Sequence, residues 1–292
     1  MKMVNIQMKF IKFIERKNNM EKGILYVVAT PIGNLDDITL RAIKILQEVD
    51  LIAAEDTRHT LKLLNHLDIS KPLISYHRHN EEVKSDILIE KLKEGQNIAL
   101  VSDAGTPGIC DPGEEVIKKC IEEEINVVPI PGACAMINSL ICSGLNTKEF
   151  TFLGFLPLNK KLRKNKLEEI KNSNKTIIIY EAPHKLETTL KDLKEILNNR
   201  KIVLAREITK IHEEFVRENI DDLIEKSKNI KGEIVLIIEE NDNISNENKL
   251  NDLSIEEHYK YYEDKGYEKK EIIKLIAKDR NVNKNEIYKL FI

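Results

Sequence analysis

The first half of the chain alternates short apolar runs with segments of helical periodicity. Five runs rich in β-branched residues occupy positions 24–30, 50–54, 72–76, 97–101 and 126–130. Between them, segments such as 38–49 and 81–95 repeat apolar residues at helical spacing. Strands that alternate with helices form a mainly parallel sheet covered on both faces. The segment 132–145 is apolar nearly all round, which predicts a buried helix.

The second half changes to a mixed pattern. Strand-like runs begin near residues 150, 176, 201, 213 and 232, with helical segments at 182–197 and 221–228. A polar, Asn-rich stretch at 240–252 then reads as a linker before segments of helical period. The predicted division is an extension (1–22), an α/β domain (23–146), a second, mixed α+β domain (147–242) and a helical tail (253–292).

The composition of the chain bears on its cellular compartment. No apolar run among the 292 residues approaches the roughly 20 needed to span a bilayer, so no membrane anchor is expected. Residues 1–22 lack the continuous apolar core of a signal peptide. The four cysteines show neither CxxC spacing nor a disulfide framework. We therefore expect a reduced, cytoplasmic protein. No His/Cys/Asp cluster has zinc-like spacing, so no catalytic metal is expected.

Charge is unevenly distributed. The net charge is −3, yet residues 1–22 hold six Lys/Arg against two Glu, and residues 268–292 hold seven against four acids. A further run, "NKKLRKNK" at 159–166, places five positive charges within the acidic body of the chain. Such local patches can contact a phosphate backbone, or they can simply be solvated surface.

Three loops rich in Gly or Pro follow predicted strands of the first half. They are 30–37, 102–113 ("SDAGTPGICDPG") and 129–135. Ligands of open parallel sheets bind outside the carboxyl ends of the strands, so the three loops predict one ligand site. The alternative is that they are tight turns and nothing more.

Two familiar nucleotide motifs are absent. "GICDPGEE" has the glycine spacing of a P-loop but carries two glutamates where Lys-Ser/Thr is needed. Gly33 alone does not make a dinucleotide fingerprint, although Glu55 and Asp56 follow at the distance of a ribose-binding acid. A ligand that is cationic and approached closely by the backbone fits better. S-adenosylmethionine, which carries a sulfonium, has this character.

Seven segments in order carry a specific resemblance. They are 25–46, 49–66, 101–113, 127–135, 180–186, 204–210 and 231–239. Together they resemble the ribosomal RNA small-subunit methyltransferase I family, which belongs to the tetrapyrrole-methylase-like, class III methyltransferases. "NKNEIY" in the tail also fits that family, whereas residues 1–22 lie outside the resemblance.

The resemblance implies a function and a cofactor. It implies 2′-O-methylation of one cytidine, position 1402, in the decoding region of 16S rRNA in the small ribosomal subunit, with S-adenosylmethionine as donor. It also implies a two-domain tetrapyrrole-methylase fold, a cofactor held between the domains, and a homodimer. The implied cofactor positions are Pro31, Ile32, Gly33, Asp103, Gly105, Thr106, Ile109, Gly132, Cys134, Ala135 and Tyr180.

Candidates for catalysis and RNA binding lie in the same motifs. A ribose hydroxyl needs a base to take its proton, and the catalytic candidates are Asp56, Glu181 and Glu207. The sequence leaves the base undecided, because Asp56 or Glu207 can equally orient a neighbouring arginine. The RNA-binding candidates are Arg58, His59, His79, Arg206, Lys269 and Lys284. The alternative for the two arginines is a structural ion pair, of Arg58 with Asp56 and of Arg206 with Glu207.

Two other functions remain open from the sequence. One is methylation of a tetrapyrrole-like small molecule, although such methylases often carry Gly-Asp-Pro where this chain has Gly105-Thr106-Pro107. The other is a regulatory module that binds the cofactor without chemistry of its own.

Overall fold

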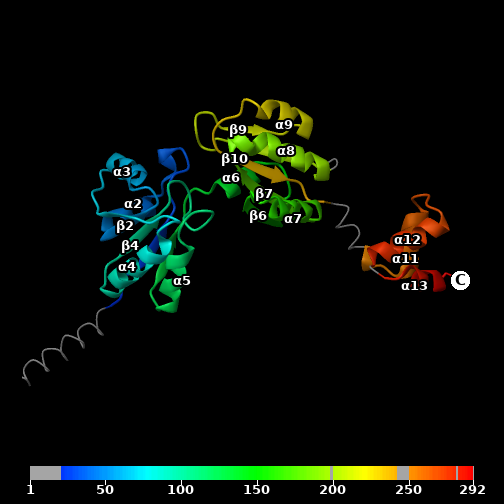
Figure 1. Ribbon diagram of the computed structural model, residues 1–292, viewed down its shortest axis with the longest axis horizontal. Coiled ribbons are helices and arrows are strands. Elements are labelled where there is room, and N and C mark those ends of the chain that lie inside the picture. The colour runs from blue at the N-terminus through cyan, green and yellow to red at the C-terminus, as the bar shows by residue number, and fades with distance from the viewer. Residues whose placement is uncertain (1–20, 198–199, 242–249, 281, 292) are drawn as a thin grey trace, which may run out of the picture. The chain divides into compact units, whose positions relative to one another are not determined.

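The computed structural model describes residues 21–197, 200–241, 250–280 and 282–291, and Figure 1 shows their elements. Two compact units are present. Unit 1 holds the chain up to Cys142 together with Ala205–Phe215, and unit 2 holds Ser143–Leu204 and the chain from Val216 onward. Of the expected extension 1–22, all but the last two residues lie outside the described part. No helix in the described ranges is both long and apolar enough to cross a membrane.

Unit 1 is built on a five-stranded sheet in the order β3-β2-β4-β1-β5. Its strands are β1 (Leu25–Val28), β2 (Leu51–Ala54), β3 (Leu73–Ser75), β4 (Ile98–Val101) and β5 (Val127–Ile130). Every neighbouring pair is parallel. The predicted parallel sheet is confirmed, and the carboxyl ends of all five strands lie at one edge, because parallel strands share a direction.

Helices cover both faces of this sheet. They are η1 (Leu35–Asp37), α2 (Leu40–Glu48), α3 (Thr57–His66), α4 (Glu81–Lys93), α5 (Glu114–Glu122) and α6 (Ala135–Ile141). On one face Leu88 of α4 and Val116 of α5 join Leu100 of β4 in an apolar cluster. On the other face the cluster holds Ala42 of α2 and Leu64 of α3. The alternation of side chains along each strand produces these two cores.

The prediction of a buried helix at 132–145 is wrong. The helix is short, and only Ser139 and Leu140 of α6 are buried. Ile141 is 64% exposed and Ile137 is 37% exposed. An apolar pattern on all sides indicates that a helix could be buried, but it does not supply the elements needed to cover its outer side.

Unit 2 contains a second five-stranded sheet in the order β6-β7-β10-β8-β9. Its strands are β6 (Phe150–Phe155), β7 (Thr176–Glu181), β8 (Ile202–Arg206), β9 (Glu214–Val216) and β10 (Ile234–Ile238). The last two residues of β8 and the first two of β9 fall in the stretch Ala205–Phe215 that is counted with unit 1. β7 is parallel to β6 and antiparallel to β10, which confirms the mixed sheet. The apolar core of the unit includes Ile179, Leu204 and Leu236 from strands and Leu190 from a helix. The helices are α7 (Lys160–Lys171), α8 (Pro183–Leu197) and α9 (Ile220–Ser227).

The described part of the tail is mainly helical and has a small core of its own. Its helices include α11 (Ile255–Glu263), α12 (Lys269–Asp279) and α13 (Lys284–Lys289). Ile276 and Tyr262 are among the buried residues of this core. His258 is fully buried, with Nε2 3.1 Å from the Asp279 carboxylate, and Arg280 donates to its Nδ1. Burial lowers the pKa of His258, so the ring is neutral and donates from Nε2.

Candidate functional site

The three Gly/Pro loops meet at the carboxyl edge of the unit 1 sheet. The amide of Thr30 donates to the carbonyl of Gly105 over 2.9 Å, and the amide of Gly105 donates back over 3.1 Å. The hydroxyl of Thr106 lies 3.4 Å from the carbonyl of Ala133, which it can reach as a donor. Residues from all three predicted loops are therefore tied into one structure.

Two glycines are required by this arrangement. Gly105 has a φ of +85°, and a Cβ there would lie 3.2 Å from Cγ2 of Ile32. A Cβ at Gly132 would lie 2.9 Å from Cβ of Ala29, at the end of β1. A larger residue would strain the backbone at the first position and push the loops apart at the second.

Carboxylates connect the ends of β2 and β4. Asp103 Oδ1 accepts a hydrogen bond of 3.0 Å from the amide of Asp56. The amide of Asp103 in turn lies 3.5 Å from Oε2 of Glu55. These bonds explain why acids follow β2 and β4, since the carboxylate after each strand accepts from a backbone amide of the loop after the other strand.

The acids of this edge repel one another. Burial and the charge of Glu55 raise the pKa of Asp111 to about 6. Burial and the charge of Asp103 raise the pKa of Glu55. Arg78 opposes both shifts, and its guanidinium also donates to the carbonyl of Cys110. A further positive charge at this edge would be stabilised by the same carboxylates.

From the sequence, the two aspartates of the 102–113 loop, Asp111 among them, were expected to favour a cationic ligand, whereas Arg78 was not singled out. Asp111 lies within the 102–113 loop and Arg78 within "YHRHNE" at 76–81, so both were visible in the sequence. The sequence could not show that the charge of Glu55 raises the pKa of Asp111 and that Arg78 opposes this shift, because both effects depend on the distances between these side chains.

Asp56 is committed to local structure. It caps α3 by accepting from the amide of Arg58 over 2.8 Å, and both its oxygens accept from the Arg58 guanidinium. These bonds lower the pKa of Asp56 to about 2. Such a carboxylate is a weak base, and the ion pair with Arg58 is the alternative that the sequence left open. His59, on the same turn, is exposed.

The segment 205–215 places Glu207 in unit 1. Glu207 Oε1 pairs with the ammonium of Lys210 at 2.9 Å. Lys210 packs on the first loop so closely that a Cβ at Gly33 would lie 2.3 Å from its Cγ. Arg206 pairs with Glu214 at 3.3 Å, so its suggested pairing with Glu207 is corrected. Glu207 thus reaches the candidate site through Lys210, a residue that sequence reasoning missed.

Glu181 is built into unit 2. The side chain is only 4% exposed, and its oxygens accept from the amide of Ala182 at 2.8 Å and from the hydroxyl of Thr189 at 2.5 Å. Thr189 accepts from Arg163, which pairs with Asp192 at 2.7 Å. This closed network favours a structural role for Glu181 over the catalytic role expected from the sequence.

The other expected residues are distributed among the two units and the tail. Ile32 is buried and Pro31 half-buried, whereas Ile109 is 40% exposed. Cys134 precedes Ala135 at the start of α6, and its side chain makes no capping bond. Tyr180 belongs to unit 2, where it packs edge-on against Phe152 and Phe155 with ring centroids 4.8 and 5.7 Å away.

Three RNA-binding candidates remain. His79 is exposed, with its ring 6.0 Å from that of His77. In the tail, Lys284 is exposed at the first turn of α13. Lys269 donates to the carbonyl of Phe291 over 2.9 Å, which gives it a structural bond.

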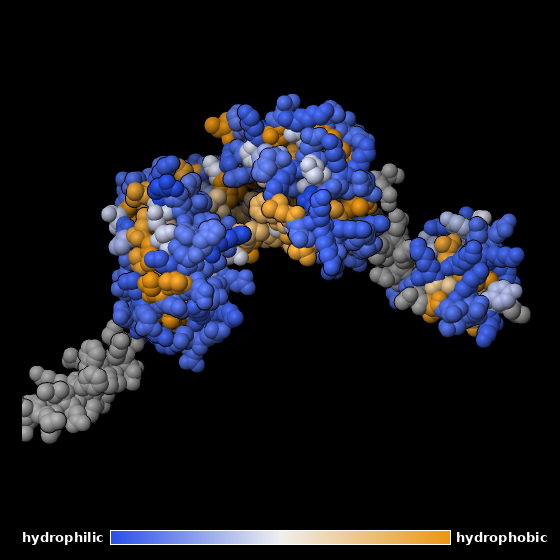
Figure 2. Space-filling model, in the orientation of Figure 1, coloured by the Kyte–Doolittle hydropathy of each residue, from blue (hydrophilic) through white to orange (hydrophobic). Residues whose placement is uncertain are grey.

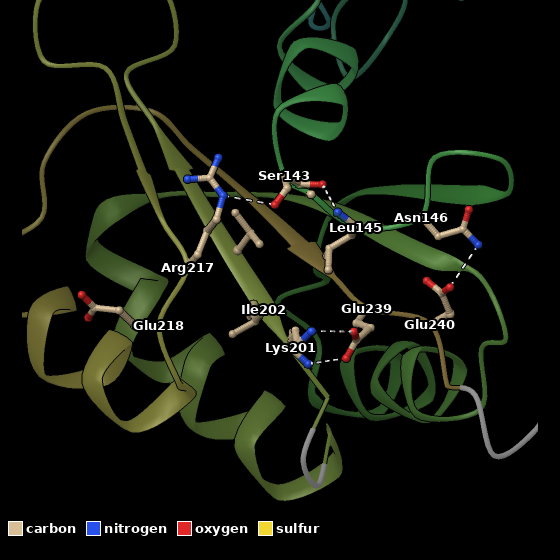
Figure 3. A pocket seen from close by; sticks show the side chains of 11 residues that line it. Ser143, Leu145, Asn146, Lys201, Ile202, Arg217, Glu218, Glu239 and Glu240 are labelled. Carbon is tan, nitrogen blue, oxygen red and sulfur yellow. Dashed lines mark hydrogen bonds and ion pairs between the residues drawn. The ribbon is translucent and has the colours of Figure 1, made fainter.

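No metal cluster is evident in the described ranges. No group of three His, Cys, Asp or Glu side chains there could hold a metal ion. A pocket in unit 2, shown in Figure 3, is lined by charged residues that already have partners. Arg217 donates to the carbonyl of Ser143, and Glu240 accepts from Asn146. The loops of unit 1 are therefore the stronger candidate.

Comparison with known proteins defines the class. The sequence matches the family of Tetrapyrrole (Corrin/Porphyrin) Methylases over residues 24–224. The methyltransferase CobJ has a TM-score of 0.58 at 17% identity, covering 75% of this chain and 94% of that one. Uroporphyrin-III C-methyltransferase from Thermus thermophilus, solved with S-adenosyl homocysteine, has a TM-score of 0.55 at 14% identity, covering 74% and 97%. The fold is that of the tetrapyrrole methylases, as the resemblance implied.

Closer relatives narrow the class. Ribosomal RNA small subunit methyltransferase I of Halalkalibacterium halodurans is 50% identical over 275 residues, 93% of this chain and 95% of the relative. The protein of the same name from Bacillus subtilis is 48% identical over 273 residues, 92% and 94% of the two chains. The chain belongs to the ribosomal RNA small subunit methyltransferase I family, which confirms the resemblance drawn from its seven motifs.

Proposed function

We propose that this enzyme transfers a methyl group from S-adenosylmethionine to the ribose 2′-oxygen of one cytidine, position 1402, in the decoding region of 16S rRNA. Membership of the ribosomal RNA small subunit methyltransferase I family, at about half identity over more than nine-tenths of the chain, carries this proposal. The proposal places the methyl donor on the loops at the carboxyl edge of the unit 1 sheet.

The residues of that edge fit the donor. Glycine at 105 and 132 lets the loops pack tightly against one another, because a Cβ there would meet Ile32 and Ala29, and this packing fixes the shape of the loops. The carboxylates of Glu55 and Asp111, whose pKa values are raised, favour a positively charged ligand. S-adenosylmethionine, when bound, supplies an electrophilic methyl group on a sulfonium. The 30–33, 102–113 and 132–135 loops would hold it, with Tyr180 of unit 2 as a further contact.

The chain's own residues then position the hydroxyl and accept its proton. As the oxygen–methyl bond forms and the methyl–sulfur bond breaks, the hydroxyl proton must pass to a base. Asp56 is a weak base and Glu181 is buried in its own network, so we assign the role to Glu207. Arg58, Arg206, His59 and His79 are assigned to the phosphates and sugars of the RNA. Alignment of the reactants provides much of the acceleration.

The tail provides a second place of contact with ribosomal RNA in this proposal. Its exposed lysines include Lys270, Lys274, Lys284 and Lys289, and its core is separate from the two sheets. Deleting residues 250–292 should weaken binding to small subunits about tenfold or more and reduce the dependence of binding on salt, because phosphate contacts release counterions. Unchanged affinity and unchanged salt dependence would remove the tail from the interface.

Assembly and location complete the proposal. The enzyme works as a homodimer in the cytoplasm, where small ribosomal subunits are its partners. The exposed apolar side chains of Ile137 and Ile141 on α6 support a covering partner such as a second copy. Light scattering should give twice the mass of the chain.

The test is methyl transfer from labelled S-adenosylmethionine to small subunits and to free 16S rRNA from cells that lack the activity. Nucleosides released from the RNA are identified by mass. A single 2′-O-methylcytidine is expected. Cofactor binding without a methylated nucleoside would reject the proposal and favour a small-molecule substrate or a regulatory role.

A further inference from the structure

An exposed apolar surface surrounds the connection from β6 to α7 in unit 2. Leu158 is 78% exposed, Leu162 55% and Phe155 54%. Figure 2 shows apolar side chains at the surface of unit 2 over β6. Large apolar groups gathered at the surface indicate a contact with another molecule rather than a contribution to the fold.

The same stretch carries cations that the fold does not use. In the described ranges the exposed ammonium groups of Lys160, Lys161 and Lys164 have no ion pair. The two other cations of the run are different, because Arg163 pairs with Asp192 and Lys166 with Glu169. Three of the five positive charges in "NKKLRKNK" are therefore available to a partner.

Their placement does not stabilise α7. The helix has no acidic residue in its first turn, where carboxylates would favour the helix dipole and cations oppose it. Lys160 and Lys164 also stand four residues apart on one face, where like charges repel. Only Ile170 of this helix is buried. Unpaired charges that disfavour their own helix are explained if an anionic partner offsets the repulsion.

We propose that Phe155, Leu158 and Leu162, with Lys160, Lys161 and Lys164, form a contact surface for ribosomal RNA on unit 2. We call these six residues the α7 surface. The lysines would neutralise backbone phosphates, while the apolar side chains provide faces on which unpaired bases stack or pack. RNA fits this surface better than an acidic protein does, because its phosphates match the lysines and its bases match the apolar side chains. The inference rests on the proposed function, which supplies the RNA.

The test compares two triple variants of equal charge change. Lys160→Gln/Lys161→Gln/Lys164→Gln removes the cations of the α7 surface. Lys191→Gln/Lys194→Gln/Lys228→Gln is the control, because its lysines lie in the same unit and are already paired with Glu187, Asp221 and Glu225. Both are titrated with a decoding-region fragment of 16S rRNA over a range of salt concentrations.

The α7 variant should bind the fragment about tenfold more weakly than the control, with the slope of log affinity against log salt reduced by about 2, since each phosphate contact on a single strand contributes about 0.7. Its affinity for S-adenosylmethionine should match the control. Equal RNA affinity and equal slope in both variants would overturn the proposal. The proposal would also be overturned if a Leu158→Ser/Leu162→Ser variant changed the mass of the protein assembly but not the affinity for RNA, because the surface would then contact another protein chain.

Binding is measured without methyl transfer, which separates this proposal from the proposed function. Fragment binding that depends on the α7 lysines, in an enzyme that methylates no RNA, would reject the function and retain the surface. If the enzyme methylates RNA but its RNA binding does not depend on those lysines, the proposed function is retained and the α7 surface is rejected.

Discussion

The carboxylates of the two units have opposite surroundings. In unit 2, Glu181 and Asp192 each have hydrogen-bonding partners, and Arg163 connects them through Thr189. In unit 1, burial and the charge of Asp103 raise the pKa of Glu55, and burial and the charge of Glu55 raise the pKa of Asp111, with Arg78 as a partial counter-charge to both. The first arrangement stabilises a fold, whereas the second leaves negative charge for a cation to neutralise.

The loops of unit 1 show why acids that lack full charge compensation suit a cationic ligand. Unit 1 ends its parallel strands in glycine-bearing loops tied together by Thr30, Gly105 and Thr106, and the acids lie beside them. A site that must accept a sulfonium requires carboxylates that are not already paired. The comparison therefore supports the proposal that the methyl donor binds in unit 1, with the acids of unit 2 serving the fold.

The difference between the two units is tested most strongly by replacing one glutamate in each unit with glutamine. Glu207→Gln should lower kcat by about 10² or more, because the amide cannot accept the hydroxyl proton, while thermal stability changes little. Glu181→Gln should lower stability by about 1–3 kcal/mol, because a buried network loses a charged acceptor, and keep most of kcat per folded molecule. Single-turnover methyl transfer and thermal unfolding measure the two effects. If Glu181→Gln abolished transfer in a stable protein, the assignment would be reversed.

Asp56→Asn refines the same assignment. Asparagine still caps α3, but the ion pair with Arg58 is lost. We expect a smaller loss of kcat than in Glu207→Gln and a raised KM for RNA, because Arg58 is no longer oriented. A larger loss of kcat at Asp56 would identify it as the base in spite of its low pKa.

A smaller effect is expected from the acids themselves. The pKa of Asp111 is raised from 3.8 to about 6, so ionised Asp111 destabilises the folded protein above that pH. Its favourable contribution is complete below about pH 4 and is lost as the pH rises through 6. Asp111→Asn should therefore stabilise the cofactor-free protein by about 1 kcal/mol near pH 7.5, a figure reduced for solvent screening, and not near pH 4.

Asp192→Asn is the matched variant in unit 2. Asp192 has its cation, Arg163, at 2.7 Å, so losing the charge should destabilise the protein by about 1 kcal/mol near pH 7.5. Chemical unfolding at the two pH values checks both variants. Stabilisation by both substitutions, or by neither, would show that the two units do not differ in this respect.

Much of the fold follows from the sequence because strands and helices depend on local patterns. The runs at 24–30 and 97–101 became adjacent parallel strands, and the glycines of the 102–113 loop occupy a turn that requires them. The burial of α6 could not be predicted, because periodicity does not say what covers a helix. The partners of the site residues also escaped prediction. Glu207 has a φ of +50°, and this turn directs it to Lys210 and away from Arg206.

The central claim is that the unit 1 loops hold S-adenosylmethionine, and calorimetric titration of two glycine variants tests it most directly. Gly105 and Gly144 have φ values of +85° and +82°, but a Cβ at Gly144 meets nothing within 4 Å. Both valine variants carry similar backbone strain, and only Gly105→Val crowds Ile32 and the loops. We predict that Gly105→Val loses cofactor binding by about 100-fold or more while folded, and that Gly144→Val binds as the wild type does. Wild-type affinity in a folded Gly105→Val protein would contradict the account.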